Sequence, residues 1–155
     1  MRRKMPGKRS DKGRKRVLYS AHMDNAALVV AVVQAARNAA DGVTWRNAPE
    51  RRRVPELLHR YVTTRTRYRA ENSTQVIRYP SALVRERVGD CKSTAVFISA
   101  LAAAAGCRSS VVFIRQQGRP WWSHVFAVVD GVVVDPLLPL DREAPNTGRR
   151  EYLIA

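Results

Sequence analysis

Residues 123–136, SHVFAVVDGVVVDP, constrain the fold of this chain more than any other segment. Two runs rich in β-branched apolar residues flank Asp130-Gly131, and an Asp-Gly pair in this setting is one of the strongest short signals of a β-hairpin. A two-residue turn would pair Val129 with Val132 and fix the register of both strands. Because side chains alternate between the two faces of a strand, that register decides which residues lie side by side.

The same register brings His124 and Asp135 to one face of the hairpin. Asp135 lies opposite Phe126, and His124, two residues from Phe126, shares its face. A carboxylate there would fix the tautomer of the imidazole, and the other ring nitrogen could then address a thiolate. A turn one residue longer would move Asp135 to the opposite face, where it would be an ordinary carboxylate at a strand end.

Cys91, in the segment VGDCKSTA at residues 88–95, is the nucleophile that such a pair would serve. Gly89-Asp90 interrupts regular structure just before a helical pattern, so Cys91 stands at the start of a helix. A helix N-terminus and an adjacent imidazole both favour a thiolate over a thiol, whose ordinary pKa is about 8.5. The alternative is that Cys91 is a buried thiol that packs like a small hydrophobic residue.

The remaining cysteine and histidines have weaker claims to a catalytic role. Cys107 follows Gly106, the residue that should stop the helix, and it is expected to be inert. His22 precedes the first predicted helix and His59 lies within an arginine-rich one; neither has an evident carboxylate partner. Both histidines are expected to be structural or solvated.

Outside the hairpin the sequence predicts three helices and one further strand. The helices are expected over 25–40, from Pro55 through ELLHRYVTTRTRYRAE, and over 91–105, with the strand in SSVVFIRQQ. Residues 72–90 are predicted to be largely irregular with a short helical turn after Pro80, and the residues after Pro136 to be irregular and polar. Helices followed by strands favour an α+β fold in which the Cys91 helix, preceded by two helices, packs on a small antiparallel sheet.

The faces of these helices follow from their apolar spacing. The first helix is apolar nearly all round and should be buried. The second should turn one side to the core and its arginines to solvent. The core residues are Leu57, Leu58, Tyr61 and Val62, and the solvent-facing residues are Arg60, Arg65, Arg67 and Arg69. On the Cys91 helix the expected core face is Ala95, Ile98, Leu101 and Ala102.

The formal charge of +15 lies mostly away from Cys91. Residues 1–16 hold nine Lys or Arg and one Asp, residues 46–69 hold eight Arg and two Glu, and residues 70–155 are nearly balanced. We therefore expect a basic disordered tail (1–16), an N-terminal helix with a linker (17–53) and one domain with a core (54–155).

The basic segments suit nucleic acid or another acidic partner, although a solvated tail that keeps the protein soluble is an alternative reading. The candidate contact residues are Arg2, Arg3, Lys4, Lys8, Arg9, Arg14, Lys15, Arg16, Arg51, Arg52 and Arg53.

Composition also argues against several classes of protein. The longest apolar run, AALVVAVV at 26–33, is far shorter than the ~20 residues of a membrane span, and no apolar stretch directly follows the basic tail as in a secretory signal. Two cysteines do not make a disulfide framework. A cytoplasmic protein without a membrane partner is expected.

The order of these motifs resembles the transglutaminase-like superfamily of cysteine enzymes. G-D-C at a helix start is followed by the strand SHVFAVV and by a strand that ends in VVVDP. The upstream segments LLHRYVTTRTRYRAE and IRYPSALVRERVGDCKSTAVFISALAAAAG are similar to the lead-in of its small bacterial and phage-encoded members. The resemblance covers roughly residues 54–140, and a phage-encoded protein would reside in the host cytoplasm or the virion.

The resemblance implies both a fold and a chemistry. The fold would be a transglutaminase-like or papain-like α+β core, in which Cys91 is the nucleophile, His124 the general base and acid, and Asp135 the orienting carboxylate. The reaction would be acyl transfer from a peptide or protein substrate through a thioester. The acceptor would be water in peptidase-like or amidase-like members and an amine in true transglutaminases. No metal or organic cofactor is implied.

Further residues could complete such a site. An oxyanion hole needs a donor besides the Cys91 backbone N–H, and Gln75, Tyr79 and Trp122 are candidates. Trp121 and Trp122 could line a substrate groove or simply cover an edge of the core. A non-catalytic scaffold, virion or nucleic-acid-associated protein that acts through its basic tail and arginine-rich helix is the competing hypothesis for the whole chain.

Overall fold

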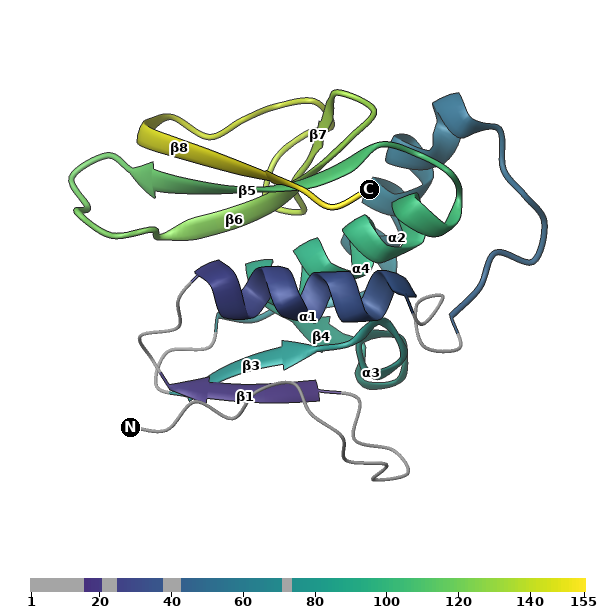
Figure 1. Cartoon of the computed structure of the whole chain (residues 1–155), viewed down its shortest axis with the longest axis horizontal. Helices are drawn as coiled ribbons and strands as arrows, with labels where there is room; N and C mark the ends of the chain where they lie inside the picture. The colour runs from purple at the N-terminus through teal and green to yellow at the C-terminus, as the bar shows by residue number, and fades with distance from the viewer. Residues whose placement is uncertain (1–15, 21–24, 38–42, 71–73) are drawn as a thin grey trace.

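The computed structural model describes residues 16–20, 25–37, 43–70 and 74–155, which form an α+β fold (Figure 1). The helices are α1 (Asn25–Arg37), α2 (Val54–Arg65), α3 (Pro80–Glu86) and α4 (Cys91–Ala104), with a 3-10 turn, η2 (Arg51–Arg53), before α2. The strands are β1 (Arg16–Ser20), β2 (Arg67–Tyr68), β3 (Thr74–Arg78), β4 (Val88–Gly89), β5 (Ser109–Gln116), β6 (His124–Val129), β7 (Val132–Val134) and β8 (Asn146–Leu153). The predicted disordered tail lies outside these residues except for Arg16, with which β1 begins.

The elements are arranged in three layers. An antiparallel sheet in the order β7-β6-β5-β8 forms one outer layer, and α1 and α4 lie beneath it (Figure 1). The antiparallel pair β1–β3 and α3 lie on the other side of these helices (Figure 1). The predicted small antiparallel sheet against the Cys91 helix is therefore confirmed.

Helix α4 is the centre of the molecule. Every residue from Lys92 to Ala102 is buried, so this part of the helix has no solvent face, whereas the sequence predicted a single buried face. Its alanines allow neighbouring elements to approach the helix closely. The ring of Phe97 stacks on that of Tyr61 of α2, with 5.1 Å between the two ring centroids. One hydrophobic core, which includes Leu28 and Val32 of α1, surrounds the helix.

The predicted hairpin forms with the predicted register. Val129 pairs with Val132, and Asp130 and Gly131 have φ angles of 47° and 82°. Positive φ at both central residues is the signature of the type I′ turn, which matches the twist of the flanking strands. The Asp130 carboxylate also accepts two hydrogen bonds from Arg51, at 2.7 and 2.8 Å, and one from the Arg108 backbone N–H at 2.8 Å.

Helix α2 is shorter than predicted. It ends at Arg65, and Thr66 is extended, whereas the sequence predicted a helix through Glu71. The hydroxyls of Thr63, Thr64 and Thr66 bond back to carbonyls of the preceding turn, which weakens a helix in favour of other conformations. The predicted faces are confirmed, because Leu58 and Val62 are buried, Leu57 and Tyr61 half-buried, and the arginines exposed.

Two segments predicted to be irregular contain strands. Between residues 72 and 90 lie β3, which pairs with β1, and β4, which pairs with β2, on either side of α3. The expected helical turn after Pro80 is α3 itself. The other segment contains β8, one of the two edge strands of the four-stranded sheet. Each of these pairings joins residues far apart in sequence, and local periodicity does not reveal them.

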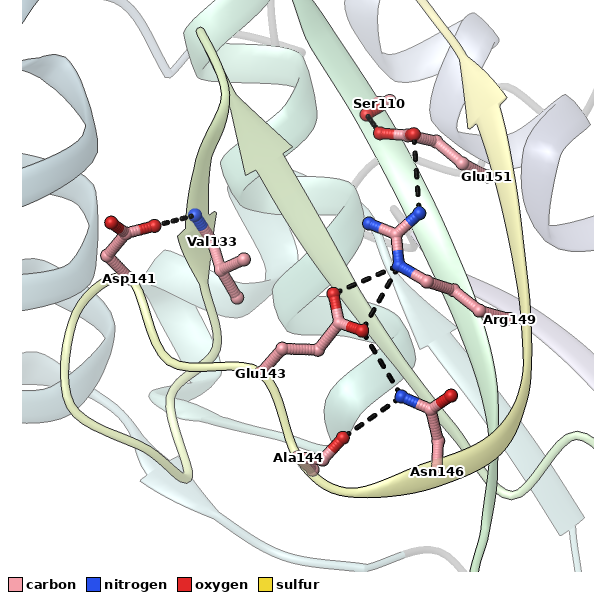
Figure 2. Close-up of polar contacts among 8 residues, drawn as sticks. All are labelled: Ser110, Val133, Asp141, Glu143, Ala144, Asn146, Arg149 and Glu151. Atoms are coloured by element: carbon pink, nitrogen blue, oxygen red, sulfur yellow. Dashed lines mark hydrogen bonds and ion pairs between the residues drawn. The ribbon is translucent and has the colours of Figure 1, made fainter.

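Polar contacts hold β8 and the loop before it against the sheet (Figure 2). Arg149 donates to Glu143 at 3.0 Å, the Glu143 carboxylate also accepts from Asn146, and the Ser110 hydroxyl donates to Glu151 at 2.6 Å. The loop covers a second, small apolar cluster on the outer face of the sheet. The cluster consists of Val112, Ile114, Phe126 and Val128, with Ala144 packed on it.

We predict that Gly89→Ala destabilises the fold. A Cβ at position 89 would lie 2.7 Å from Cδ1 of the fully buried Leu83 and 3.2 Å from Cβ of Ser93. Overpacking of this kind typically costs about 1–3 kcal/mol in the free energy of unfolding, measured here by urea denaturation. Gly148→Ala is the control, because its Cβ would meet the flexible Arg115 side chain no closer than 3.4 Å. Equal losses in both variants would contradict the prediction.

Candidate active site

Cys91 is the first residue of α4, as predicted, and Asp90 caps the helix in front of it. The Asp90 carboxylate accepts from the backbone N–H groups of Lys92 and Ser93 at 3.0 and 3.2 Å. Its other oxygen forms an ion pair with the Lys92 ammonium group. Cys91 is half-buried and forms no disulfide.

His124 and Asp135 meet at the hairpin as the register requires. The Nε2–H of His124 donates to Oδ2 of Asp135 at 2.7 Å, and the two residues are 6 % and 0 % exposed. The second oxygen of Asp135 accepts from the Leu137 backbone N–H at 3.0 Å, which fixes the carboxylate. Because Nε2 is occupied, Nδ1 is the ring nitrogen that remains for another partner.

Cys91 affects the pKa of the same imidazole ring. Burial of the ring lowers the pKa of His124, but hydrogen bonding with Asp135 and Cys91 and their negative charges outweigh burial and raise this pKa to about 10. This raised pKa favours the protonated ring over the neutral one. An imidazolium beside a cysteine is the partner that a thiolate requires. The structure thus brings together the three residues that the sequence singled out.

Tyr68 is a residue of this site that the sequence analysis missed. Burial, followed by the charge of Cys91 and hydrogen bonding with it, raises the pKa of Tyr68 well above its ordinary value. Tyr68 lies in the two-residue strand β2, within a stretch predicted to be helical. A strand this short has no periodicity, and its pairing with β4 depends on residues about twenty positions away, so no local signal identifies it.

The other candidates for the oxyanion hole or substrate groove lie in varied surroundings. The Tyr79 hydroxyl donates to Gln34 of α1 at 2.9 Å. The half-buried Trp122 ring has the guanidinium groups of Arg115 and Arg150 over it, at 4.4 and 5.3 Å from its centroid. Trp121 is 59 % exposed. Gln75 belongs to β3, and its side chain lies outside the described residues.

The second cysteine and the second histidine have structural surroundings. Cys107 is 3 % exposed, and burial together with the nearby Asp130 charge raises its pKa to about 11, which keeps it a thiol. His59 Nε2 donates to the Leu138 carbonyl at 2.8 Å and so ties α2 to the loop after β7. His22 lies outside the described residues.

The basic candidates are only partly within the described residues. The side chains of Arg2 to Arg16 in that set lie outside them. Arg51, Arg52 and Arg53 are exposed on η2, but Arg51 pairs with Asp130 and Arg52 with Glu50, both at 2.7 Å. Two of the three described candidate charges are therefore balanced locally.

The described residues offer no metal centre: no three His, Cys, Asp or Glu side chains among them gather as metal ligands would. Within the same ranges, no helix has the length and apolar character needed to cross a membrane. Comparison of the chain with protein-family models, with curated proteins and with solved structures finds no match. What the site can do follows from its own geometry.

We predict that His124 makes the stability of the protein depend on pH. Its folded pKa, about 10, lies above the unfolded value near 6.5, so protonation of the ring stabilises the folded state. This contribution is complete below about pH 6.5 and is lost as the pH rises through the folded pKa. The free energy of unfolding of the wild type, relative to that of His124→Asn, should fall over this interval. A pH-independent difference would contradict the prediction.

Proposed function

We propose that this protein is a cysteine-dependent acyl-transfer enzyme that cleaves or transfers a peptide amide through a thioester. The observation that carries the proposal is the 2.7 Å bond from His124 to the buried Asp135, on a ring that also interacts with Cys91 at a helix start. The motif order supports membership of the transglutaminase-like superfamily in a minimal form, and a cytoplasmic location forms part of the same proposal.

The proposed acylation step follows from the protonated state of His124. The Cys91 thiolate attacks the amide carbonyl carbon, a C–S bond forms, and the carbonyl electrons move onto oxygen. When the carbonyl reforms, the C–N bond breaks and His124 gives its proton to the departing nitrogen. The products are a thioester on Cys91, a free amine and a neutral imidazole hydrogen-bonded to Asp135.

Deacylation reverses the roles of the ring. The neutral His124 accepts a proton from water or from an amine as that acceptor attacks the thioester, and Cys91 leaves as a thiolate beside the regenerated imidazolium. Water as the acceptor gives hydrolysis, and an amine gives transamidation. Asp135 keeps the ring oriented in both steps without taking its proton.

We predict that iodoacetamide alkylates Cys91 much faster than Cys107 at pH 6.5, and that His124→Ala slows alkylation of Cys91 at least about ten-fold. The thiolate is the reactive form, and an unperturbed thiol is only about 1 % ionised at this pH. Peptide mass mapping of timed samples gives both rates. p-Nitrophenyl acetate should likewise acetylate Cys91 and release nitrophenolate.

The controls separate a reactive pair from simple exposure. Cys107 reports on non-specific labelling, because it is buried and its pKa is raised. Cys91→Ala should remove the ester reaction completely. Equal labelling of both thiols, or a His124→Ala rate equal to that of the wild type, would refute the proposed function.

A second proposed role is contact with nucleic acid through the basic segments. It is favoured by the distribution of charge along the sequence, which concentrates in residues 1–16 and 46–69 rather than in residues 70–155, which contain Cys91. The two roles are compatible, because a basic tail could hold an enzyme near an acidic surface. The local pairing of Arg51 and Arg52 indicates that the tail would make most of the contacts.

We predict that deletion of residues 1–15 reduces the salt dependence of binding to single-stranded DNA. Each phosphate neutralised contributes about 0.7 to the slope of log affinity against log salt for single strands, so the slope should fall by several units. Fluorescence anisotropy of a labelled oligonucleotide at several salt concentrations measures it. The double variant Arg52→Gln, Arg53→Gln is the control and should change the slope little. Absence of binding by the full chain at low salt would exclude this role.

A further inference from the structure

Two arginines of neighbouring strands converge on one tryptophan ring. The guanidinium carbons of Arg115 on β5 and Arg150 on β8 lie 4.4 and 5.3 Å from the centroid of the Trp122 ring. Arg150 pairs with Phe113, and Arg115 follows Phe113 by two positions, so both arginines lie on the sheet face that Phe113 occupies. We call the side chains of Arg115, Arg150 and Trp122 the Arg–Trp cluster.

The Arg–Trp cluster lies on the face of the sheet that covers α4, toward the end of this helix that bears Cys91. Phe113 belongs to the hydrophobic core around α4, and both Trp122 and Cys91 pack against that core. At the start of β5, the Ser109 hydroxyl donates to the Ser99 carbonyl of α4 at 3.2 Å. The second half of α4 therefore lies against the start of β5, and the first residue of the helix lies toward the end of β5 at which the cluster forms.

The backbone fixes the cluster relative to His124. Only Ser123 separates Trp122 from His124, and His124 pairs with Ile114, the residue before Arg115. The Ser123 N–H donates to the Ile114 carbonyl at 3.0 Å, and the Ser123 hydroxyl accepts from a second backbone N–H of β5 at 2.9 Å. The cluster and the imidazole are thus held by the same pair of strands.

The two positive charges of the cluster have no acidic partner in the part of the chain that the structure describes. Both arginines are exposed, and their guanidinium groups make no hydrogen bond or ion pair within those residues. The adjacent Arg149, by contrast, pairs with Glu143 and Glu151 (Figure 2). A guanidinium group carries five N–H donors in a fork that matches a carboxylate, and contact with an aromatic ring restricts its motion. The cluster therefore offers two positioned cations with unused donors.

We propose that the Arg–Trp cluster is a substrate subsite that binds the carboxylate of an aspartate or glutamate close to the amide that Cys91 attacks. The inference rests on the proposed function, since it assigns a substrate class, acidic peptides, to the same site. Two guanidinium groups over one ring suit a single carboxylate. A single-stranded nucleic acid would instead use an open aromatic face for base stacking, and the Trp122 ring has guanidinium groups over it.

Iodoacetyl peptides test for a carboxylate subsite within reach of the thiol. Each probe is an iodoacetyl tripeptide amide with one Glu at its first, second or third position and Gly elsewhere, and each has a counterpart with Gln in place of Glu. The Cys91 thiolate bonds to the methylene carbon, and iodide leaves with the electron pair of the broken C–I bond. The ratio of the Glu rate to the Gln rate then measures recognition of the negative charge.

We predict that Cys91 reacts with at least one Glu peptide at least about three-fold faster than with its Gln counterpart, a difference within the range of exposed charge pairs. Arg115→Gln and Arg150→Gln should each lower this ratio at least about two-fold, because each removes one of the two cations. Peptide mass mapping of timed samples gives the rates. Alkylation by iodoacetamide, which carries no charge, should keep its wild-type rate in both variants.

Arg149→Gln is the matched control. It removes the same charge from the position next to Arg150, but its guanidinium group is already paired with Glu143 and Glu151, so the Glu-to-Gln ratio should stay at the wild-type value. An equal fall in Arg115→Gln, Arg150→Gln and Arg149→Gln would mean that the ratio reports net charge alone, and it would overturn the inference.

The remaining outcomes separate failure of the inference from failure of the proposed function. Equal rates for every Glu and Gln pair would overturn the subsite while His124-dependent alkylation of Cys91 stands. If Arg115→Gln and Arg150→Gln weaken binding to single-stranded DNA but leave the peptide ratio unchanged, the cluster contacts nucleic acid and the inference is wrong. If wild-type Cys91 reacts with iodoacetamide no faster than Cys107, the proposed function fails and the inference fails with it.

Discussion

The two-residue turn at Asp130-Gly131 sets the face of every side chain on β6 and β7, and one inserted residue would reverse the faces beyond it. With this register His124 and Asp135 meet in the interior, and Asp135 is fully buried. A buried ion pair gains little net stability, because desolvation offsets much of the attraction. Asp135 is better understood through its effect on the ring, whose protonated form it favours. The turn therefore matters to chemistry as much as to folding.

Helix α4 adds the second constraint, because it is buried on all sides and yet must present a thiol at its first residue. Small residues along the helix admit α1 on one side and the sheet on another, and Gly89 admits Leu83 and Ser93 just before the cap. The nucleophile thus belongs to the most tightly packed element, and its partners come from the hairpin packed on it. Positions set by a packed core vary little, which suits a reaction that depends on sub-ångström alignment.

The sequence predicted the parts of this site that local chemistry encodes. Asp130-Gly131 specified the turn, the β-branched runs specified β6 and β7, and Gly89-Asp90 marked the start of α4. It did not predict β8. This edge strand exposes most of its residues, so its sequence is largely polar and lacks the apolar alternation of a half-buried strand. Nor did the sequence predict the pairing of β2 with β4. Tyr68 was missed for that reason. Its position depends on a pairing partner at Gly89, and neither short strand carries a hydrophobic pattern that would reveal the contact.

Asp90 and Lys92 have a consequence for how the protein would respond to its medium. The Asp90 carboxylate caps α4, but its charge alone would oppose a thiolate on the next residue, and the Lys92 ammonium group cancels that charge at close range. Asp90 and Lys92 are only 1 % and 9 % exposed, so dissolved ions screen them weakly. Contacts between the basic segment 1–16 and nucleic acid, as proposed above, would instead be screened strongly. If the protein binds nucleic acid as proposed, rising ionic strength would weaken that binding while changing the electrostatics around Cys91 little. Binding and reactivity would then respond differently to the same change in salt.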